Sequence, residues 1–231
     1  MAKAADALAP AEKVSRRPRL APLAELPDYS AWFEGKEFSS DWLSSKIVPW
    51  FTALRDWRDA PAEVLEVGSY EGRSAVVFLS YMPAAQLTCV DTFGLEDVTS
   101  GTDSGQVVEQ RFDANLQPFG DRMTKIKGTA ASALDQMRTK GKNYDVVYLD
   151  ADKQRDGVFG LSALAWPLLR VGGILIWDDL RWGTGKADRD RPESAIRLFC
   201  SAFSNAIEVL HDDRQMIVRK SSDWPLISGS R

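Results

Sequence analysis

The stretch that decides the fold is LEVGSYEGRSA, residues 65–75, where an apolar run ends in a glycine turn that leads into a helical pattern. Four further short apolar runs follow along the chain, and stretches with helical periodicity separate them. Strands that alternate with helices in this way predict a parallel, doubly wound α/β sheet. The five runs are AEVLEVG (62–68), AQLTCVD (85–91), MTKIKG (123–128), YDVVYLD (144–150) and GGILIWDD (172–179).

The segments on either side of these runs complete the expected architecture. Residues 29–60 are rich in aromatic side chains and carry apolar residues at helical spacing, which predicts an N-terminal helical extension. A further helix is expected after Pro192, and AIEVLHDDRQMIVRK (206–220) is typical of an antiparallel hairpin, which would bring the sheet to seven strands. The helically spaced residues of the extension are Leu43, Ile47, Trp50 and Leu54.

The length of 231 residues and the hydrophobic content of 44% suit one globular domain with appendages. We expect this domain over residues 61–220, after the helical cap at 29–60. Residues 1–28, rich in Ala, Pro and Arg, are expected to form a disordered tail, with a docking arm or a transit peptide as alternatives. Residues 221–231 are expected to form a C-terminal tail.

Charge and composition argue against several classes of partner. The formal net charge of -4 offers no general attraction to nucleic acid or to an anionic membrane. No segment has the ~20 apolar residues of a membrane span, and the N-terminus lacks the apolar core of a signal peptide. We therefore expect a cytoplasmic protein that binds neither nucleic acid nor membrane. Cys89 and Cys200 lack metal-binding spacing and are expected to be reduced core residues, and homo-oligomerisation is left open.

The glycine turn is the first candidate binding site, because ligands of such sheets bind at the carboxyl ends of the strands. The first strand reaches Glu66, and Gly68, Ser69 and Gly72 follow before the next helix. Glycines there let a ligand approach the backbone closely, although a tight turn alone could also require them. Tyr70 stands where a dinucleotide fingerprint has its second glycine, which weakens the interpretation as an NAD-dependent oxidoreductase.

This turn resembles motif I of the class I S-adenosylmethionine (SAM)-dependent methyltransferases, an acidic residue followed by G-x-x-x-G. The resemblance implies that SAM binds at Glu66, Gly68, Ser69 and Gly72. Asp91 ends the next strand, where a carboxylate can accept both hydroxyl hydrogens of a ribose. The alternative for Asp91 is a helix N-cap or a turn residue. The family usually lines its adenine pocket with the loop that here contains Gly128, Thr129 and Ala130, although any loop after a strand could look alike.

Three carboxylates stand at the ends of the fourth and fifth apolar runs. Asp150 ends one run, Asp178 and Asp179 end the other, and neighbouring strand ends would bring them together. Crowded carboxylates repel, and we expect too few cationic side chains at fixed spacing to neutralise them. Oxygen ligands without His or Cys favour Mg²⁺, then Mn²⁺ or Ca²⁺. The alternative is helix capping and surface salt bridges with Lys153, Arg155 and Arg181.

The sequence DADK (150–153) followed by WDD (177–179) and a further Trp resembles the cation-dependent O-methyltransferases, including the catechol and caffeoyl-CoA enzymes. The resemblance covers about residues 40–220. It implies that the metal is held by Asp150, Asp178 and Asp179, and that Asp150 also contacts SAM. Those families have Asn or Asp at the third position. The Asp found here is similar to a bacterial branch that methylates sugar hydroxyls of macrolide and aminocoumarin antibiotics.

The resemblance offers two candidates for the catalytic base. Lys153 matches the base of the catechol-type enzymes, and Asp152 matches the base position of the sugar-modifying branch. We expect Asp152 to serve with sugar-like acceptors and Lys153 with phenolic ones. Three aromatic residues, Phe38, Trp42 and Trp182, are expected to border the acceptor pocket, with core packing as an equal alternative.

The sequence therefore predicts a SAM-dependent, divalent-cation-dependent O-methyltransferase that acts on a vicinal diol or a comparable hydroxylated small molecule. SAM already carries an activated methyl group, so such an enzyme must mainly align the acceptor oxygen and help to remove its proton. The alternatives are a metal-independent methyltransferase of the same fold, a SAM- or nucleotide-binding module without turnover, and an NAD-dependent oxidoreductase.

Overall fold

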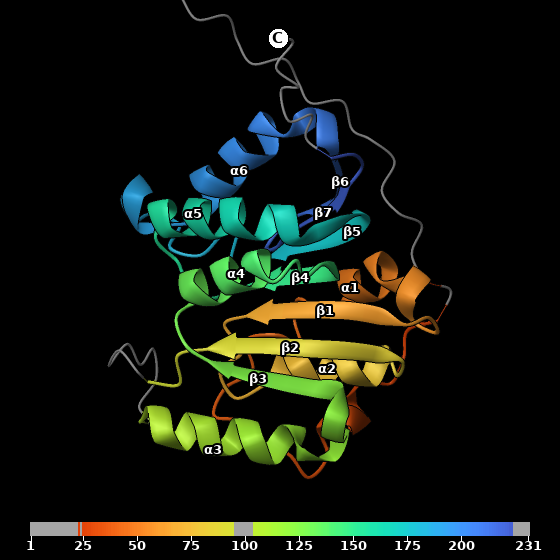
Figure 1. Ribbon diagram of the computed structural model, residues 1–231. Coiled ribbons are helices and arrows are strands. Elements are labelled where there is room, and N and C mark those ends of the chain that lie inside the picture. The colour runs from red at the N-terminus through yellow and green to blue at the C-terminus, as the bar shows by residue number, and fades with distance from the viewer. Residues whose placement is uncertain (1–22, 24, 95–103, 224–231) are drawn as a thin grey trace, which may run out of the picture.

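The computed structural model describes residue 23, residues 25–94 and residues 104–223. The centre of the molecule is a seven-stranded sheet with the strand order β3-β2-β1-β4-β5-β7-β6 (Figure 1). The first five strands are parallel, and β7 pairs antiparallel with both β5 and β6. The strands are β1 Ala62–Val67, β2 Ala85–Asp91, β3 Met123–Lys127, β4 Tyr144–Leu149, β5 Leu169–Trp177, β6 Ile207–Asp212 and β7 Met216–Lys220.

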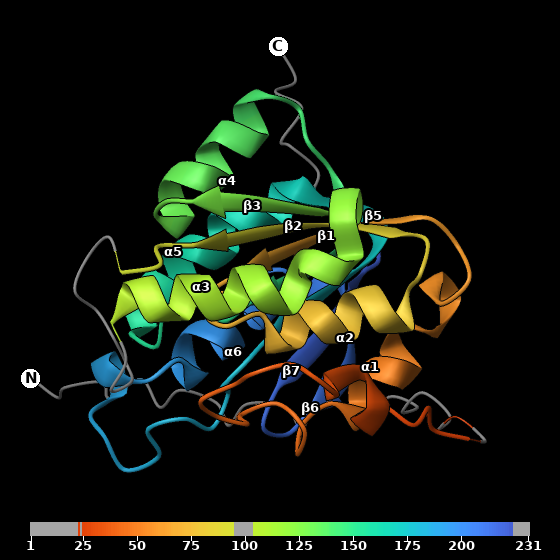
Figure 2. The ribbon, with the colours of Figure 1, turned by 90° about the horizontal axis from the view of Figure 1, so that it is seen from below.

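Helices cover both faces of the sheet (Figure 2). One hydrophobic core contains buried residues of α1, α2 and α3, and a second contains buried residues of α4, α5 and α6. The α-helices of the described residues are α1 Val48–Ala53, α2 Arg73–Tyr81, α3 Gly105–Leu116, α4 Ala130–Thr139, α5 Arg155–Ala165 and α6 Glu193–Ala202. Short 3₁₀ helices lie at Ser30–Phe33, Arg55–Trp57, Gln117–Arg122, Trp166–Leu168, Asp188–Asp190 and Ser204–Ala206.

This architecture confirms the doubly wound fold and the C-terminal antiparallel hairpin that the apolar runs predict. Among the described residues, no helix combines the length and the apolar character that a membrane crossing requires. The predicted tails fall mostly outside the described residues, which end at residue 223. The domain boundaries at 29–60 and 61–220 stay predictions.

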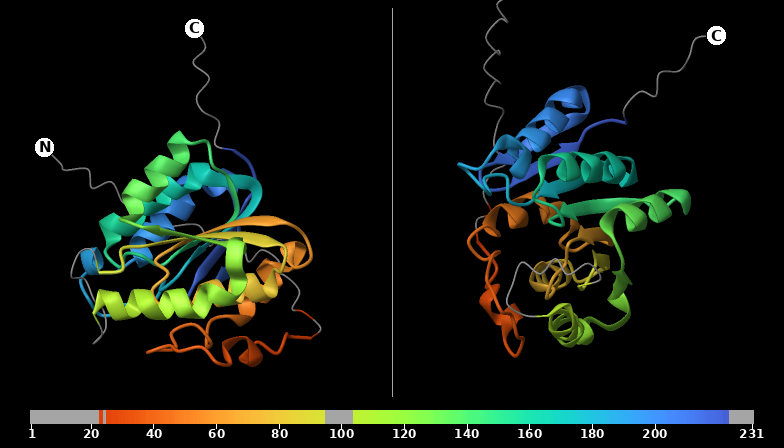
Figure 3. Two further views of the ribbon diagram at one scale, coloured as in Figure 1. Left: turned by 60° about the horizontal axis from the view of Figure 1, so that its bottom comes forward. Right: turned by 90° about the vertical axis from the view of Figure 1, so that its left-hand side faces the viewer.

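The N-terminal extension is less helical than its apolar spacing predicts. Leu43 and Ile47 are buried as expected, but the α-helix begins only at Val48. Pro49 stands in the first turn of α1, where its missing N–H costs nothing, whereas a longer helix would place it in the interior. The segment before α1 therefore runs in an irregular path beside α2, as the orange ribbon shows in Figures 2 and 3.

The order of the strands creates a switch point between β1 and β4. The chain moves outward from β1 through β2 to β3, and then returns to place β4 on the other side of β1. Loops that leave β1 and β4 diverge there, which opens the crevice in which sheets of this kind bind ligands. The arrowheads of β1, β2 and β3 mark this edge of the sheet in Figure 1.

Candidate active site at the strand ends

The register of the sheet places several of the predicted site residues in one row. Val67 pairs with Val90 and with Leu149, and Leu149 pairs with Trp177. The next residue on each strand continues the hydrogen-bond ladder by one step. The backbone N–H groups of Gly68, Asp150 and Asp178 donate to carbonyl oxygens of the neighbouring strand over 2.8 to 3.0 Å. The row consists of Asp91, Gly68, Asp150 and Asp178.

Gly68 lets the turn after β1 pass directly over the end of β4. Its φ of +93° favours glycine, and a Cβ atom there would lie 2.6 Å from the carbonyl carbon of Asp150. The glycine is thus needed for the contact between two loops of the protein, a requirement that motif I by itself does not reveal. Gly72, the second glycine, has a φ of +80° and precedes the first residue of α2.

Glu66 lies beneath this turn and is fully buried. Its carboxylate accepts hydrogen bonds from the hydroxyl of Ser74 and, over 3.4 Å, from the thiol of Cys89. Burial raises the pKa of Glu66 to about 7, against the opposite effect of its hydrogen bonds. Ser69 is also buried, at the wall of the cavity described below.

Asp91 accepts hydrogen bonds from the backbone of the loops that follow β1 and β2. Its Oδ2 accepts from the N–H of Tyr70 over 2.8 Å, and its Oδ1 accepts from the N–H of Phe93 over 2.8 Å. The side chain stays partly exposed. Asp91 therefore has the hydrogen bonds of a turn residue, and each oxygen retains a lone pair with which a ligand hydroxyl could bond.

Thr129 and Ala130 begin helix α4 beside Asp91. The Thr129 side chain caps this helix by accepting from the N–H of Ser132 over 3.4 Å. The N–H of Gly128 donates to the carbonyl oxygen of Asp91 over 2.9 Å, so this loop and the end of β2 are directly connected. The structure thus brings the predicted adenine loop next to the predicted ribose residue.

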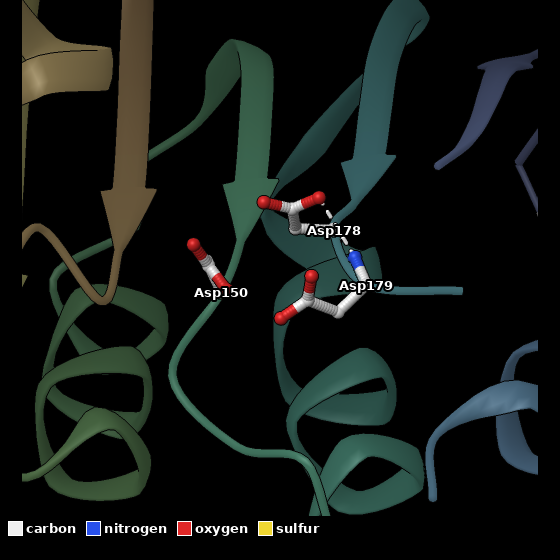
Figure 4. A group of neighbouring side chains, drawn as sticks. All are labelled: Asp150, Asp178 and Asp179. Atoms are coloured by element: carbon white, nitrogen blue, oxygen red, sulfur yellow. Dashed lines mark hydrogen bonds between the residues drawn. The ribbon is translucent and has the colours of Figure 1, made fainter. Parts of the chain in front are cut away.

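The three predicted metal ligands converge at the ends of β4 and β5 (Figure 4). One carboxylate oxygen from each of Asp150, Asp178 and Asp179 lies within 4.8 Å of the others. Asp179 has a φ of +55°, which turns the chain sharply after Asp178, and its N–H donates to Asp178 Oδ1 over 2.7 Å. This turn allows two successive residues to face the same point.

Two lysines balance much of this negative charge, which corrects the expectation that cationic neighbours would be too few. The Lys153 ammonium bonds Asp150 and lies 2.7 Å from Asp179 Oδ2. Lys46 comes from the N-terminal segment, and its ammonium lies 2.6 Å from Asp178 Oδ1 and 3.2 Å from Asp179 Oδ1. Three carboxylates thus face two ammonium groups, which leaves one negative charge unbalanced.

Burial and these charges shift the pKa values of the cluster in different directions. Burial raises the pKa of Asp150 to about 7, although Lys153 acts against this. Burial also acts to raise the pKa of Asp179, but Lys153 and Lys46 outweigh it and lower that pKa. Burial acts to lower the pKa values of Lys46 and Lys153, but their carboxylate partners outweigh it and raise both, so both lysines are charged.

Asp152 does not join the carboxylate cluster. Its Oδ1 accepts from the N–H of Gln154 over 2.7 Å, and its Oδ2 lies so close to Gly157 that a Cβ atom there would be 1.9 Å away. The carboxylate therefore leans against the first turn of α5. Of the other cations considered for the cluster, Arg155 pairs with Asp156 and Asp188 instead, and Arg181 with Glu193.

A cavity connects the glycine turn with the carboxylates. Residues 68–71, 73 and 74 form one wall, and Tyr148, Asp150 and Asp178 line the cavity at the strand ends. Phe38 and Trp42 of the N-terminal segment also line this cavity, whereas Trp182, the third residue expected at the acceptor pocket, does not. Trp182 instead packs under the ammonium of Lys186, which lies 3.8 Å from its ring centre. Trp42 is 53% exposed and faces the ring of Tyr70.

The motifs in the sequence do not predict that Lys46, Tyr148 and Gln215 contact the cluster. The Tyr148 hydroxyl lies 2.7 Å from Asp178 Oδ2, and Gln215 Nε2 donates to Asp178 Oδ1 over 3.1 Å. Tyr148 is the penultimate residue of β4 and lies two positions before Asp150, which is the one local signal that could have found it. Lys46 and Gln215 reach Asp178 from distant parts of the chain.

Comparison with known families identifies the class of protein. Residues 65–180 match the model of a family described as a methyltransferase domain, a range that holds the glycine turn and all three carboxylates. The chain belongs to this methyltransferase family. A comparison with curated protein sequences finds no significant match.

Solved structures of methyltransferases share the fold. MycE, from the mycinamycin biosynthetic pathway and solved with Mg, SAH and mycinamycin VI, has a TM-score of 0.57 and 20% identity, and the match covers 83% of this chain. The present chain spans only 53% of the MycE chain. An O-methyltransferase from Bacillus cereus, solved with SAH, has a TM-score of 0.55 and 16% identity, and the match covers 83% of this chain and 86% of that one.

A third similar structure is apo CalS11, a TDP-rhamnose 3'-O-methyltransferase of calicheamicin biosynthesis. Its TM-score is 0.52 at 16% identity, and the match covers 76% of this methyltransferase and 79% of CalS11. The family match and these folds confirm the resemblance to class I methyltransferases that the glycine turn indicates.

Proposed function

We propose that this methyltransferase uses SAM and a divalent cation, Mg²⁺ or otherwise Mn²⁺ or Ca²⁺, to methylate a hydroxyl group of a small molecule. The observation that carries the proposal is the row of strand-end residues, in which the motif I turn lies directly against Asp150 and three carboxylates converge beside it. This arrangement supports a methyl donor and an acceptor oxygen held side by side.

The cofactor would lie along the row from β2 to β4. We assign its ribose to Asp91, because both carboxylate oxygens retain acceptor capacity and the side chain is partly exposed. The cavity beside Gly68 and Ser69 suits the methionine part. The SAH found in the MycE and Bacillus cereus structures supports a cofactor of this kind. The remaining proposed contacts are Glu66, Gly72, Thr129, Ala130 and Asp150.

The carboxylate cluster suits a hard cation, because Asp150, Asp178 and Asp179 offer only oxygen ligands and retain an unbalanced negative charge. A bound divalent cation would lower the pKa of an acceptor hydroxyl and fix the direction of its attack. It would also offset the negative charge of the three carboxylates, which favours the deprotonated acceptor. Asp150, Asp178 and Asp179 would hold this cation.

The acceptor is proposed to be a sugar-like or catechol-like diol. The partly exposed ring of Trp42 at the cavity offers a flat apolar face, on which either a sugar or an aromatic ring can pack. CalS11, named for a TDP-rhamnose 3'-hydroxyl, and MycE, solved with mycinamycin VI, support the sugar-like class. Their identity to this chain is too low to carry the choice.

Between the two candidate bases, the geometry favours Lys153. Its ammonium bonds two carboxylates of the cluster, whereas the Asp152 carboxylate leans on the first turn of α5. Lys153 is charged in this structure and would have to lose a proton before it could accept one. A nearby divalent cation repels the ammonium and lowers its pKa, which would produce the neutral amine.

The proposal is tested by methyl transfer from SAM to a panel of diols, followed by mass spectrometry. We expect activity to vanish in EDTA and to return with Mg²⁺ or Mn²⁺. Asp179→Ala should lower turnover by about 100-fold or more while SAM affinity, measured by calorimetry, stays close to that of the wild type. At saturating metal, Lys153→Met should lose turnover and Asp152→Asn should retain most of it.

A metal-independent methyltransferase is the second candidate function, and one observation favours it. Lys46 and Lys153 already bond all three carboxylates without a metal ion, so the cluster could serve to hold the loops. Full activity of enzyme whose metal content is shown by elemental analysis to be negligible would select this candidate. Loss of methyl transfer when EDTA removes the metal would exclude the metal-independent candidate.

A further inference from the structure

Lys46 occupies the carboxylate cluster from outside the sheet. It lies between the N-terminal segment that lines the cavity and helix α1, and it is followed directly by the fully buried Ile47. Its side chain is only 10% exposed, and its partner Asp178 is 4% exposed. A lysine buried to this extent, with its ammonium held by two carboxylates, acts as an internal cation of the site.

The oxygens of Asp178 have no free capacity while Lys46 is in place. Oδ1 receives Lys46 over 2.6 Å, the N–H of Asp179 over 2.7 Å and Gln215 over 3.1 Å. Oδ2 receives Lys46 over 2.7 Å and the hydroxyl of Tyr148 over 2.7 Å. A carboxylate has about four lone-pair positions. A metal ion can therefore bind Asp178 only after one of these donors leaves.

Lys46 is the donor most easily removed. Tyr148 belongs to strand β4, and the Asp179 N–H belongs to the backbone turn after β5. Gln215 is itself held by the indole N–H of Trp50 over 2.9 Å and is 1% exposed. The lysine side chain is a flexible four-carbon stem, and a like charge arriving at the cluster repels its ammonium group.

We propose that Lys46 is a tethered counter-cation that competes with the divalent metal for Asp178, so that the metal must displace the ammonium group in order to bind. The inference rests on the metal site of the proposed function. Lys46 thereby sets the metal affinity of the site and protects the carboxylates from mutual repulsion when the metal is absent. Since Phe38 and Trp42 belong to the same N-terminal segment, metal binding and the shape of the cavity are linked.

The first test is calorimetric titration of Mg²⁺ into the full chain and its variants. Lys46→Met removes the competing charge and should tighten metal binding about 10- to 100-fold, the equivalent of one hydrogen bond to a charged group. Lys46→Arg keeps the charge and should bind no more tightly than the wild type. Lys36→Met is the matched control, because Lys36 lies in the same segment but donates to the backbone oxygen of Asn115.

Thermal unfolding separates competition from a purely structural role. Without metal, Lys46→Met should melt below the wild type, because its carboxylates lose their cation. Saturating Mg²⁺ should then raise its Tm more than that of the wild type, since tighter binding to the folded state stabilises it further. Metal affinity that is unchanged or weaker in folded Lys46→Met overturns the inference.

A measurement on the wild type covers the case in which Lys46→Met does not fold. Limited acetylation followed by peptide mass spectrometry should show that Mg²⁺ increases the reactivity of Lys46 and leaves that of Lys36 unchanged. Unchanged reactivity of Lys46 at saturating Mg²⁺ overturns the inference, but it leaves the proposed function standing. Active wild type that binds no Mg²⁺ would instead refute the cation dependence itself.

Discussion

The buried carboxyl group of Glu66 gives a quantitative prediction for stability. Glu66 is fully buried beneath the glycine turn, and burial raises its pKa from the usual 4.5 to about 7. Replacement by glutamine keeps the shape and an acceptor for the Ser74 hydroxyl, but it removes the charge that burial disfavours. Glu66→Gln should therefore change how the free energy of unfolding depends on pH.

The sign follows from proton binding. Below about pH 4.5 the Glu66 carboxyl is protonated in both the folded and the unfolded chain, so it does not make the free energy of unfolding depend on pH. As pH rises toward 7 the unfolded chain loses the proton first, and the folded chain becomes progressively less favoured. The difference between a pKa of 4.5 in the unfolded chain and about 7 in the folded chain lowers the free energy of unfolding by about 3 kcal/mol. This loss is complete once the pH exceeds about 7.

Urea unfolding at about pH 5 and about pH 8 measures this effect. From pH 5 to pH 8 the free energy of unfolding of the wild type should fall by about 2 to 3 kcal/mol more than that of Glu66→Gln. Asp150 also has a pKa raised by burial, but it is present in both proteins, so most of its own contribution cancels in the difference between them. Glu63→Gln, near the exposed beginning of the same strand, should behave like the wild type. Equal losses in the wild type and in Glu66→Gln would refute the burial argument.

Three further predictions concern the cofactor, the loop contact and the acceptor. Asp91→Ala should weaken SAM binding by about 1 to 3 kcal/mol in calorimetry, and unchanged affinity in a folded variant would remove Asp91 from the site. Gly68→Ala should lower the Tm more than Gly172→Ala does. Both glycines have a positive φ, but only a Cβ atom at position 68 would meet backbone atoms. Equal decreases in Tm would contradict the close contact between the two loops. Trp42→Ala should raise the acceptor KM, whereas Trp182→Ala should leave it unchanged because the Trp182 ring does not line the cavity. The reverse result would place the acceptor pocket on the other side of the carboxylate cluster.

The amino-acid sequence predicts the parts of this protein that depend on local order. Apolar runs of strand length, glycine turns and intervening helical periods specify a doubly wound sheet, because each run must be buried on both faces. The acidic residues that follow such runs, Asp91, Asp150 and Asp178, are then placed at one edge of the sheet by topology alone. Even the late start of α1 had a local signal in Pro49, which the apolar spacing obscured.

Which charged side chains meet depends on how distant parts of the chain pack together. Lys46 and Gln215 reach Asp178 across 132 and 37 residues of chain, and contacts of this range leave no trace in periodicity or composition. The orientation of Asp152 was equally inaccessible, since a carboxylate after a strand can turn toward the site or accept from the next backbone N–H. Local patterns specify backbone placement, whereas the partners of a side chain depend on how distant elements pack, and this packing is what places an ammonium group at the predicted metal site.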